Sequence, residues 1–181
     1  MQMIGVEKYK VAVVPHDEKW ADEYEAARDE VSAILGGNVV EINHVGSTAV
    51  KGIYAKPILD VAVVVKSIGA LNFSGMEAAG YEYLGERHDT GKYLFVRRLN
   101  GLISTHHTAC YLENNDDYNS TLLFCRYLNE HPEYAQRYSD LKIELAEKYP
   151  DDRLIYTEAK SGFIRNIIAL AKGANSCRIK S

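Results

Sequence analysis

The sequence predicts an α+β fold in which a mixed β-sheet carries flanking helices and a C-terminal helical cap. Strand-like and helical segments alternate up to Asp116, and the chain is helical beyond it. The valine-rich run at residues 61–65 is typical of a buried strand. With 181 residues, of which 46% are hydrophobic, the chain suits one domain, which we place at residues 1–173, followed by a disordered tail at residues 174–181.

One long helix and two short strands are predicted ahead of residue 44. The helix begins near Asp17, a good N-cap residue, and ends at the Gly36-Gly37 pair. Its apolar side chains recur at helical spacing, namely Trp20, Tyr24, Ala27, Val31 and Ile34. Residues 11–14 form a strand before this helix, and residues 39–42 form a strand after it.

Turn and proline signals predict the elements of the second half. A helix and three strands are expected at residues 67–79, 81–84, 92–99 and 102–112. The last two strands form a β-hairpin, because Asn100-Gly101 is the kind of dipeptide that two-residue hairpin turns favour. Three helices complete the chain, at residues 117–130, 132–149 and 152–172. Pro132 suits the first turn of the second helix, and Pro150 separates that helix from the third.

The most informative motif is His44-Val45-Gly46-Ser47-Thr48, which is followed by Ala55-Lys56-Pro57-Ile58-Leu59-Asp60. It predicts a strand, a glycine-serine turn, a short helix and a second strand that opens on a carboxylate. Because glycine lacks a Cβ, Gly46 allows a ligand to approach the backbone closely. Backbone amides and the Ser47 and Thr48 hydroxyls at a helix mouth suit phosphate oxygens. Asp60 is then placed to hold a divalent cation against that phosphate.

This motif resembles the nucleotidyltransferase superfamily related to DNA polymerase beta, whose members place two acidic residues after a Gly-Ser turn. More closely, the chain resembles the GrpB family in an ordered series of motifs across residues 10–170. These motifs lie at residues 44–53, 55–60, 123–128, 131–132, 138–142 and 156–160. The resemblance implies a nucleotidyltransferase-like fold and a nucleotide whose phosphates contact Gly46, Ser47 and Thr48. It also implies Mg²⁺ or Mn²⁺ on Asp60.

For an active enzyme, the resemblance implies nucleotidyl transfer, with Asp60 as a catalytic residue. A nucleophile attacks the α-phosphorus of a nucleoside triphosphate, and pyrophosphate leaves. Two positions depart from the family patterns: Ala62 stands at the second acidic position, and Ala109 stands where many GrpB relatives carry a second histidine beside His107. Two-metal phosphoryl transfer needs several carboxylates. A non-catalytic nucleotide- or anion-binding module is therefore the alternative function.

Basic residues accompany the apolar stripes of the three C-terminal helices. Lys160 lies inside the stripe of the third helix, Lys142 borders that of the second, and Arg126 adjoins that of the first. Buried cations need partners, and a polyphosphate between the sheet and the helical cap is a partner for all three. Lys56, before Pro57, is a fourth candidate phosphate ligand. The alternative is that these side chains pack their aliphatic stems and extend their charged ends to water.

Two histidines and one serine have both a functional and a structural interpretation. His44 precedes the turn, where its imidazole either orients a phosphate or forms a hydrogen bond within the turn. His106 and His107 face opposite sides of their strand; the family pattern favours His107 as a metal ligand, and a structural histidine is the alternative. Ser47 is assigned to phosphate binding rather than to capping of the short helix.

Composition limits the partners. The formal net charge of −4 argues against a broad nucleic-acid surface, although it allows a locally basic pocket. Three cysteines without close spacing indicate reduced thiols, and no apolar stretch is long enough to span a bilayer. We therefore expect a cytoplasmic protein with a small-molecule nucleotide ligand and no membrane partner. In some bacteria GrpB domains are fused to dephospho-coenzyme A kinase, so the resemblance also implies a link to coenzyme A biosynthesis.

Overall fold

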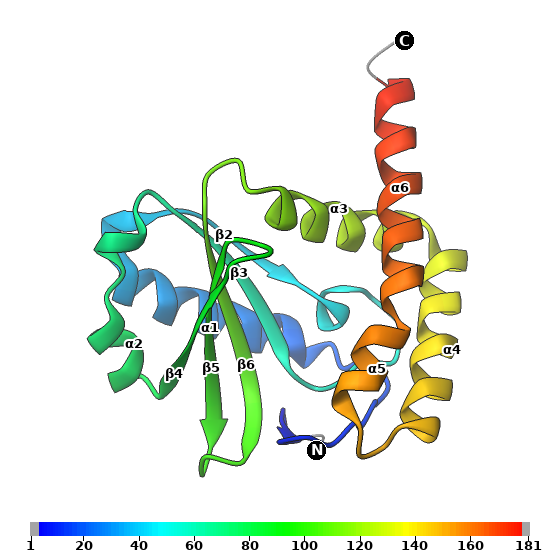
Figure 1. The fold of residues 1–181 in the computed structure, drawn as a ribbon, viewed down its shortest axis with the longest axis horizontal. Helices are drawn as coiled ribbons and strands as arrows, with labels where there is room; N and C mark the ends of the chain where they lie inside the picture. The colour runs from blue at the N-terminus through cyan, green and yellow to red at the C-terminus, as the bar shows by residue number, and fades with distance from the viewer. Residues whose placement is uncertain (1–3, 179–181) are drawn as a thin grey trace.

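A six-stranded mixed sheet forms the centre of the protein, and helices cover both of its faces (Figure 1). The computed structural model describes the backbone of residues 4–178 and the side chains of residues 4–174. The strands are β1 (Val6–Glu7), β2 (Val39–Val45), β3 (Leu59–Val65), β4 (Tyr81–Arg87), β5 (Lys92–Leu99) and β6 (Ile103–Leu112). The helices are α1 (Lys19–Leu35), α2 (Phe73–Ala78), α3 (Asp116–Glu130), α4 (Pro132–Lys148), α5 (Arg153–Ala159) and α6 (Ser161–Arg178). The predicted α+β class is confirmed.

The strand order is β2-β3-β6-β5-β4, and β1 pairs with the start of β6. Only the β3–β6 pair is parallel among the described strands; the others are antiparallel. Both faces of β3 are therefore covered, which explains why its sequence is a nearly continuous apolar run. Val61, Val63 and Val65 pack towards α1 and α2, whereas Ala62 and Val64 pack towards α3, α4 and α6.

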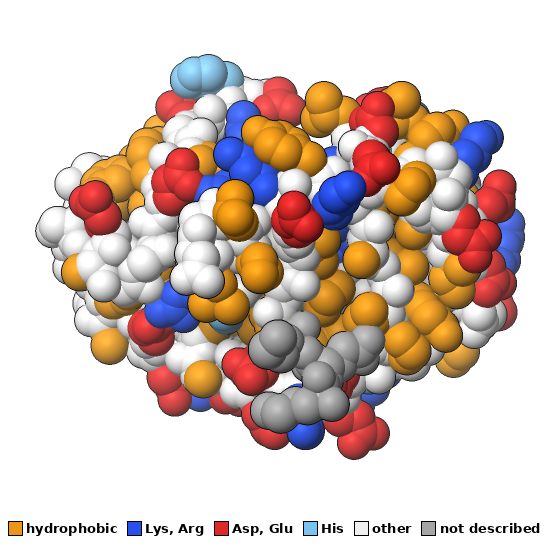
Figure 2. Space-filling view, turned by 90° about the horizontal axis from the view of Figure 1, so that it is seen from below, with side chains coloured by type: hydrophobic (Ala, Val, Ile, Leu, Met, Phe, Trp, Pro, Cys, Tyr) orange, Lys and Arg blue, Asp and Glu red, His pale blue; other side chains and the backbone are white. Residues whose placement is uncertain are grey.

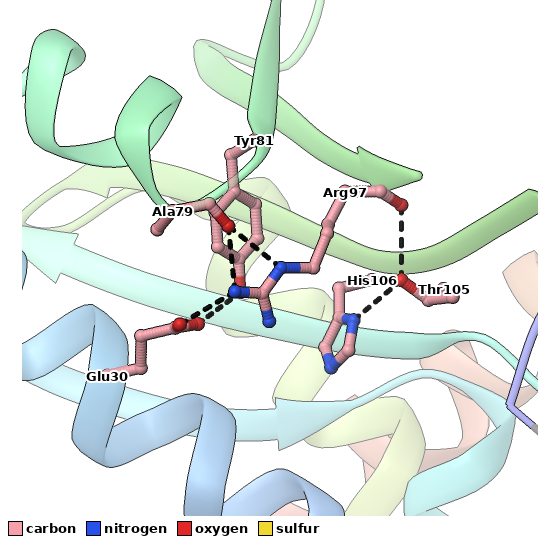
Figure 3. Close-up of polar contacts among 6 residues, drawn as sticks. All are labelled: Glu30, Ala79, Tyr81, Arg97, Thr105 and His106. Carbon is pink, nitrogen blue, oxygen red and sulfur yellow. Dashed lines mark hydrogen bonds and ion pairs between the residues drawn. The ribbon is translucent and has the colours of Figure 1, made fainter. Parts of the chain in front are cut away.

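A polar network closes the α1 side of the sheet near its β4 edge (Figure 3). Arg97 of β5 has one guanidinium nitrogen, Nη2, 2.6 Å from the Glu30 carboxylate, and it also donates to the carbonyl of Ala79. Its guanidinium lies 4.8 Å from the centroid of the Tyr81 ring. His106 packs against Tyr81 here, and burial lowers its pKa to about 4. His106 is thus on the face opposite His107, as strand alternation predicts.

The Asn100-Gly101 hairpin is confirmed. Both residues have positive φ, at 51° and 71°, as a type I′ turn requires. By contrast, the predicted strand at residues 11–14 is wrong, because only Val14 forms a bridge, to Ala55. The backbone N–H of Val11 donates instead to Pro150, in the loop before α5.

Two predicted helices are each divided. In the segment at 67–79, a single 3₁₀ turn at Ile68–Ala70 precedes α2, because Asn72 accepts from the backbone of Gly75 and starts a new helix there. The segment at 152–172 divides at Lys160 into α5 and α6. Ser161 and Gly162 follow this junction, and both residue types have low helix propensity.

The short helix α5 lies across the lower end of α6 (Figure 1). It exposes Leu154 and Ile155, at 82% and 46%, and hydrophobic side chains gather over α4 and α5 when the molecule is seen from below (Figure 2). The predicted tail at 174–181 overlaps α6, which continues to Arg178; residues 179–181 lie outside the described residues. The helices among residues 4–178 lack the combination of length and hydropathy that a bilayer span requires.

Candidate functional site

The glycine-serine turn and the start of β3 meet at one corner of the sheet. Val45, the last residue of β2, pairs with Asp60 of β3, and His107 of β6 lies beside Asp60 on its other side. Gly46 has a φ of +73°, and a Cβ built on it would overlap Oδ2 of Asp60. Only glycine therefore permits this turn and this carboxylate to lie so close together. The predicted order of strand, turn and carboxylate-led strand is confirmed.

A cleft of about 250 Å³ opens at this corner, between the sheet and α5. We call it the basic cleft. Five residues that the sequence singled out line it, namely Ser47, Lys56, Asp60, His107 and Lys160. Its other lining residues are Ile58, Arg153, Tyr156 and Thr157. The basic cleft is thus formed by residues of the turn, the start of β3, the middle of β6 and α5.

Asp60 and His107 form a pair in the wall of the basic cleft. The Nδ1 of His107 lies 3.1 Å from Oδ1 of Asp60, while Oδ2 packs against Gly46. The side chains of His107 and Asp60 are 22% and 39% exposed, respectively, so the pair remains accessible from the cleft. Gly46 on one side and His107 on the other hold the carboxylate in place.

Three cations, Lys56, Arg153 and Lys160, line the basic cleft together with this carboxylate. The ammonium groups of Lys160 and Lys56 lie 4.1 Å and 5.3 Å, respectively, from the ring centroid of Tyr156. Burial, followed by the nearby charge of Arg153, lowers the pKa of Lys56 to about 8. Burial, followed by the charge of Lys56, lowers the pKa of Lys160 to about 8. Asp60 opposes both shifts, but one carboxylate faces three cations, so the cleft carries net positive charge near neutral pH.

Lys142 lies behind the cleft rather than in its wall. Its side chain is 1% exposed, its ammonium group donates to the carbonyl of Tyr54, and the ring centroid of Tyr138 is 4.5 Å away. Burial, and then the charge of Lys160, lower its pKa to about 6. The sequence correctly placed Lys142 on a buried face, but its partner is a backbone carbonyl and an aromatic ring.

His44 and Thr48 stabilise the turn from within. Nε2 of His44 is 2.9 Å from Oγ1 of Thr48, which in turn donates to the carbonyl of Ile58. The His44 ring stacks on Tyr24 at 4.8 Å, and burial lowers its pKa to about 4. Thr48 is 2% exposed. Neither side chain lines the basic cleft, so the structure places both in the structural role that the sequence allowed for His44.

Arg126 also lies away from the basic cleft. It is on α3, its side chain is 57% exposed, and its Nε is 3.8 Å from the Glu130 carboxylate one turn later. The helix turns this position outwards, beside a different surface depression that also includes Leu122. Of the three helix cations that the sequence singled out, only Lys160 lines the basic cleft.

The metal centre expected from the sequence is incomplete. Ala62, at the second acidic position, is 1% exposed and pairs with Ala109 of β6, inside the apolar core under α3. Within the described residues, no group of three or more His, Cys, Asp or Glu side chains is arranged to hold a metal ion. Asp60 and His107 do not fit a two-cation centre on their own, and we derive no reaction step through one.

Arg153 is the cleft residue that sequence reasoning missed. Arg153, Tyr156 and Lys160 follow one another at spacings of three and four, which places them on one helical face. That signal was present in the sequence. The apolar stripe of this segment begins at Tyr156, and Arg153 lies one turn before it, so the stripe alone does not include Arg153.

Replacement of Gly46 by alanine tests the geometry of the corner. Gly52 is a matched control, because its φ is +75° and a Cβ there meets nothing within 4 Å. Both variants introduce backbone strain, and only Gly46→Ala also displaces Asp60. We expect Gly46→Ala to lower the free energy of unfolding by about 1–3 kcal/mol more than Gly52→Ala does, measured by denaturant titration. When Asp60 is also replaced by alanine, we expect this difference between the two losses of unfolding free energy to become smaller. Equal losses in the two variants would contradict the contact.

Comparisons with known proteins agree with this architecture. The family model described as GrpB protein matches residues 10–170. The chain is 36% identical to the "Glutamate-rich protein GrpB" of Alkalihalophilus pseudofirmus, over 92% of this chain and 98% of that protein. It is 34% identical to the "UPF0157 protein YqkA" of Bacillus subtilis, over 91% of this chain and 48% of that protein.

Solved structures extend the comparison to the fold. The crystal structure of the conserved protein GrpB from Enterococcus faecalis is similar with a TM-score of 0.82 and 32% identity, over 88% of this chain and 96% of that chain. The Cid1 poly(U) polymerase with MgGTP bound is similar with a TM-score of 0.52 and 19% identity, over 75% of this chain and 44% of that chain. This second likeness shows a shared nucleotidyltransferase-like fold. Because the family model, the similar proteins and the series of motifs agree, we conclude that the chain belongs to the GrpB family.

Proposed function

We propose that the basic cleft binds the phosphates of a nucleotide or of a nucleotide-containing cofactor, and that the chain acts as a non-catalytic binding module. One observation carries this proposal: Lys56, Arg153 and Lys160 converge on a single cleft beside Ser47. Burial first, and then a neighbouring cation, lower the pKa of each lysine, and Asp60 does not offset the two effects. A phosphate group supplies negative charge to these partly desolvated cations and accepts hydrogen bonds from the lysines, the guanidinium and the hydroxyl.

The cleft dimensions favour phosphates over a whole nucleotide. A volume of about 250 Å³ is below the roughly 300–1,000 Å³ of pockets that enclose drug-sized ligands. The phosphates therefore occupy the cleft, and the nucleoside lies towards its mouth. The fold supports this choice of ligand class, since the similar Cid1 structure is described with MgGTP bound. The expected cytoplasmic location and the link to coenzyme A biosynthesis stay predictions.

The binding module is preferred to a nucleotidyltransferase because of Ala62. Its methyl group lies in the apolar core, where a second carboxylate of a cation pair would have to stand. Without that pair, a transferred phosphoryl group lacks the charge compensation that such reactions depend on. Metal-dependent transfer remains the second candidate, because Asp60 keeps its place beside the turn. Release of pyrophosphate from any nucleoside triphosphate with Mg²⁺ or Mn²⁺ would favour that candidate.

Calorimetric titration tests the binding proposal. We expect at least one of ATP, GTP, CTP, UTP and coenzyme A to bind, and binding to persist in EDTA because no cation pair is needed. Lys160→Gln removes a charge-assisted hydrogen bond worth about 1.5–3 kcal/mol, so we expect Kd to rise about tenfold or more. Lys19→Gln, an exposed residue at the start of α1, is the control with the same charge change. Failure of every ligand to bind, or equal effects of the two variants, would remove the proposal.

Affinity for the same ligand should fall as pH rises from 7 to 9. Only the protonated lysine attracts phosphate, and the pKa of Lys56 and that of Lys160 are both about 8. Above pH 8 binding must therefore be accompanied by proton uptake, which weakens it. We expect Kd to rise at least about tenfold between pH 7 and pH 9. A Lys56→Arg/Lys160→Arg double variant does not titrate in this range and should give a flat profile. An unchanged or increasing affinity in the original protein would contradict the assignment.

A further inference from the structure

A second cavity, of about 480 Å³, opens on the α1 side of the sheet, between α2 and the edge strand β4. Its wall is aromatic. Phe73, Tyr83 and Phe95 contact one another, with ring centroids 5.0 to 5.7 Å apart. The carboxylates of Glu77 and Glu82 also line it. We call it the aromatic cavity; it shares no lining residue with the basic cleft.

The aromatic cavity is open to solvent. Phe73 and Tyr83 are 41% and 40% exposed, although large aromatic side chains contribute most to stability when they are buried. Within the described residues β4 pairs with β5 alone, so its outer edge is free for a partner. An exposed cluster of rings at a sheet edge, bordered by charged groups, is typical of an interaction surface.

The charge around the rings is negative. Glu82 is paired with Arg98, but Glu77 has no ion-pair partner in the part of the chain that the structure describes. Aromatic rings present a negative face to an approaching cation. Rings and an uncompensated carboxylate together therefore favour a positively charged occupant, and they disfavour an acidic one.

The protein already binds one of its own cations in this way. Just inside the aromatic cavity, the Arg97 guanidinium contacts the Tyr81 ring and the Glu30 carboxylate (Figure 3). Tyr81 itself lines the cavity, and the Arg97 side chain passes 3.8 Å from the position of a Cβ on Gly80. Tyr83 and Glu77 also line the aromatic cavity, and among the described residues neither takes part in a cation–π contact or an ion pair.

We propose that the aromatic cavity binds an arginine or lysine side chain of a partner polypeptide that lies along β4. The side chain enters the cavity, where its charge meets Glu77 and its stem packs on Phe73 and Tyr83. Backbone pairing contributes over a short stretch, because β4 bulges between Tyr83 and Glu86 and the bulge interrupts the ladder. Recognition therefore depends on the cationic side chain rather than on an added strand.

The probe is the peptide acetyl-Gly-Arg-Gly-Arg-Gly-amide, titrated into the ¹⁵N-labelled full chain and followed by two-dimensional NMR. We expect amide shifts concentrated in residues 73–86 and 93–97, and none there with the matching glutamate peptide. Tyr83→Ala and Glu77→Gln should each raise Kd about threefold, as expected for one exposed cation–π contact and one exposed ion pair. Glu147→Gln, an exposed residue of α4, removes the same charge and should leave Kd unchanged.

Several outcomes overturn the proposal. These are the absence of shifts in residues 73–86, equal shifts with the glutamate peptide, and equal effects of Glu77→Gln and Glu147→Gln. If Tyr83→Ala does not fold, the comparison of the two glutamate variants decides alone. Lys160→Gln, in the basic cleft, should leave the peptide titration unchanged, so this test is independent of the proposed phosphate binding.

Discussion

The close approach of the Gly46 backbone to the Asp60 carboxylate fixes the geometry on which the basic cleft depends. It holds the turn, β3 and His107 of β6 at one corner of the sheet, and α5 covers that corner from the other side. A side chain at residue 46 would force the carboxylate out of place.

The charge distribution then determines what the corner can do. In a nucleotidyltransferase, carboxylates gather cations, and the cations receive the phosphates. Here the second carboxylate position is the buried Ala62, and the positive charge is supplied by Lys56, Arg153 and Lys160. In our proposal these protein cations compensate the phosphate charge. On this charge distribution rests our proposal that the corner binds phosphate and does not transfer it.

The corner was predictable because its information is local. The strand, the glycine-serine turn and the carboxylate lie within residues 39–65, and their pairing follows from one short connection. Lys160 was predictable from its place in an apolar stripe. Arg126 was not, because the rotation of α3 about its axis, set by packing on the sheet, turns it outwards. Similarly, the partner of Lys142 is the carbonyl of Tyr54 in a distant loop, which no helical pattern predicts.

The aromatic cavity had no sequence signal, since α2 and β4–β5 assemble it through tertiary packing. The basic cleft is the feature on which the account of function stands, and a crystal structure with a non-hydrolysable ATP analogue, determined in EDTA, tests it most directly. We expect phosphate oxygens within hydrogen-bond distance of Lys56, Lys160 and Ser47, with Asp60 still against Gly46. Phosphates bound elsewhere, or a moved Asp60 that leaves the corner open, would contradict it.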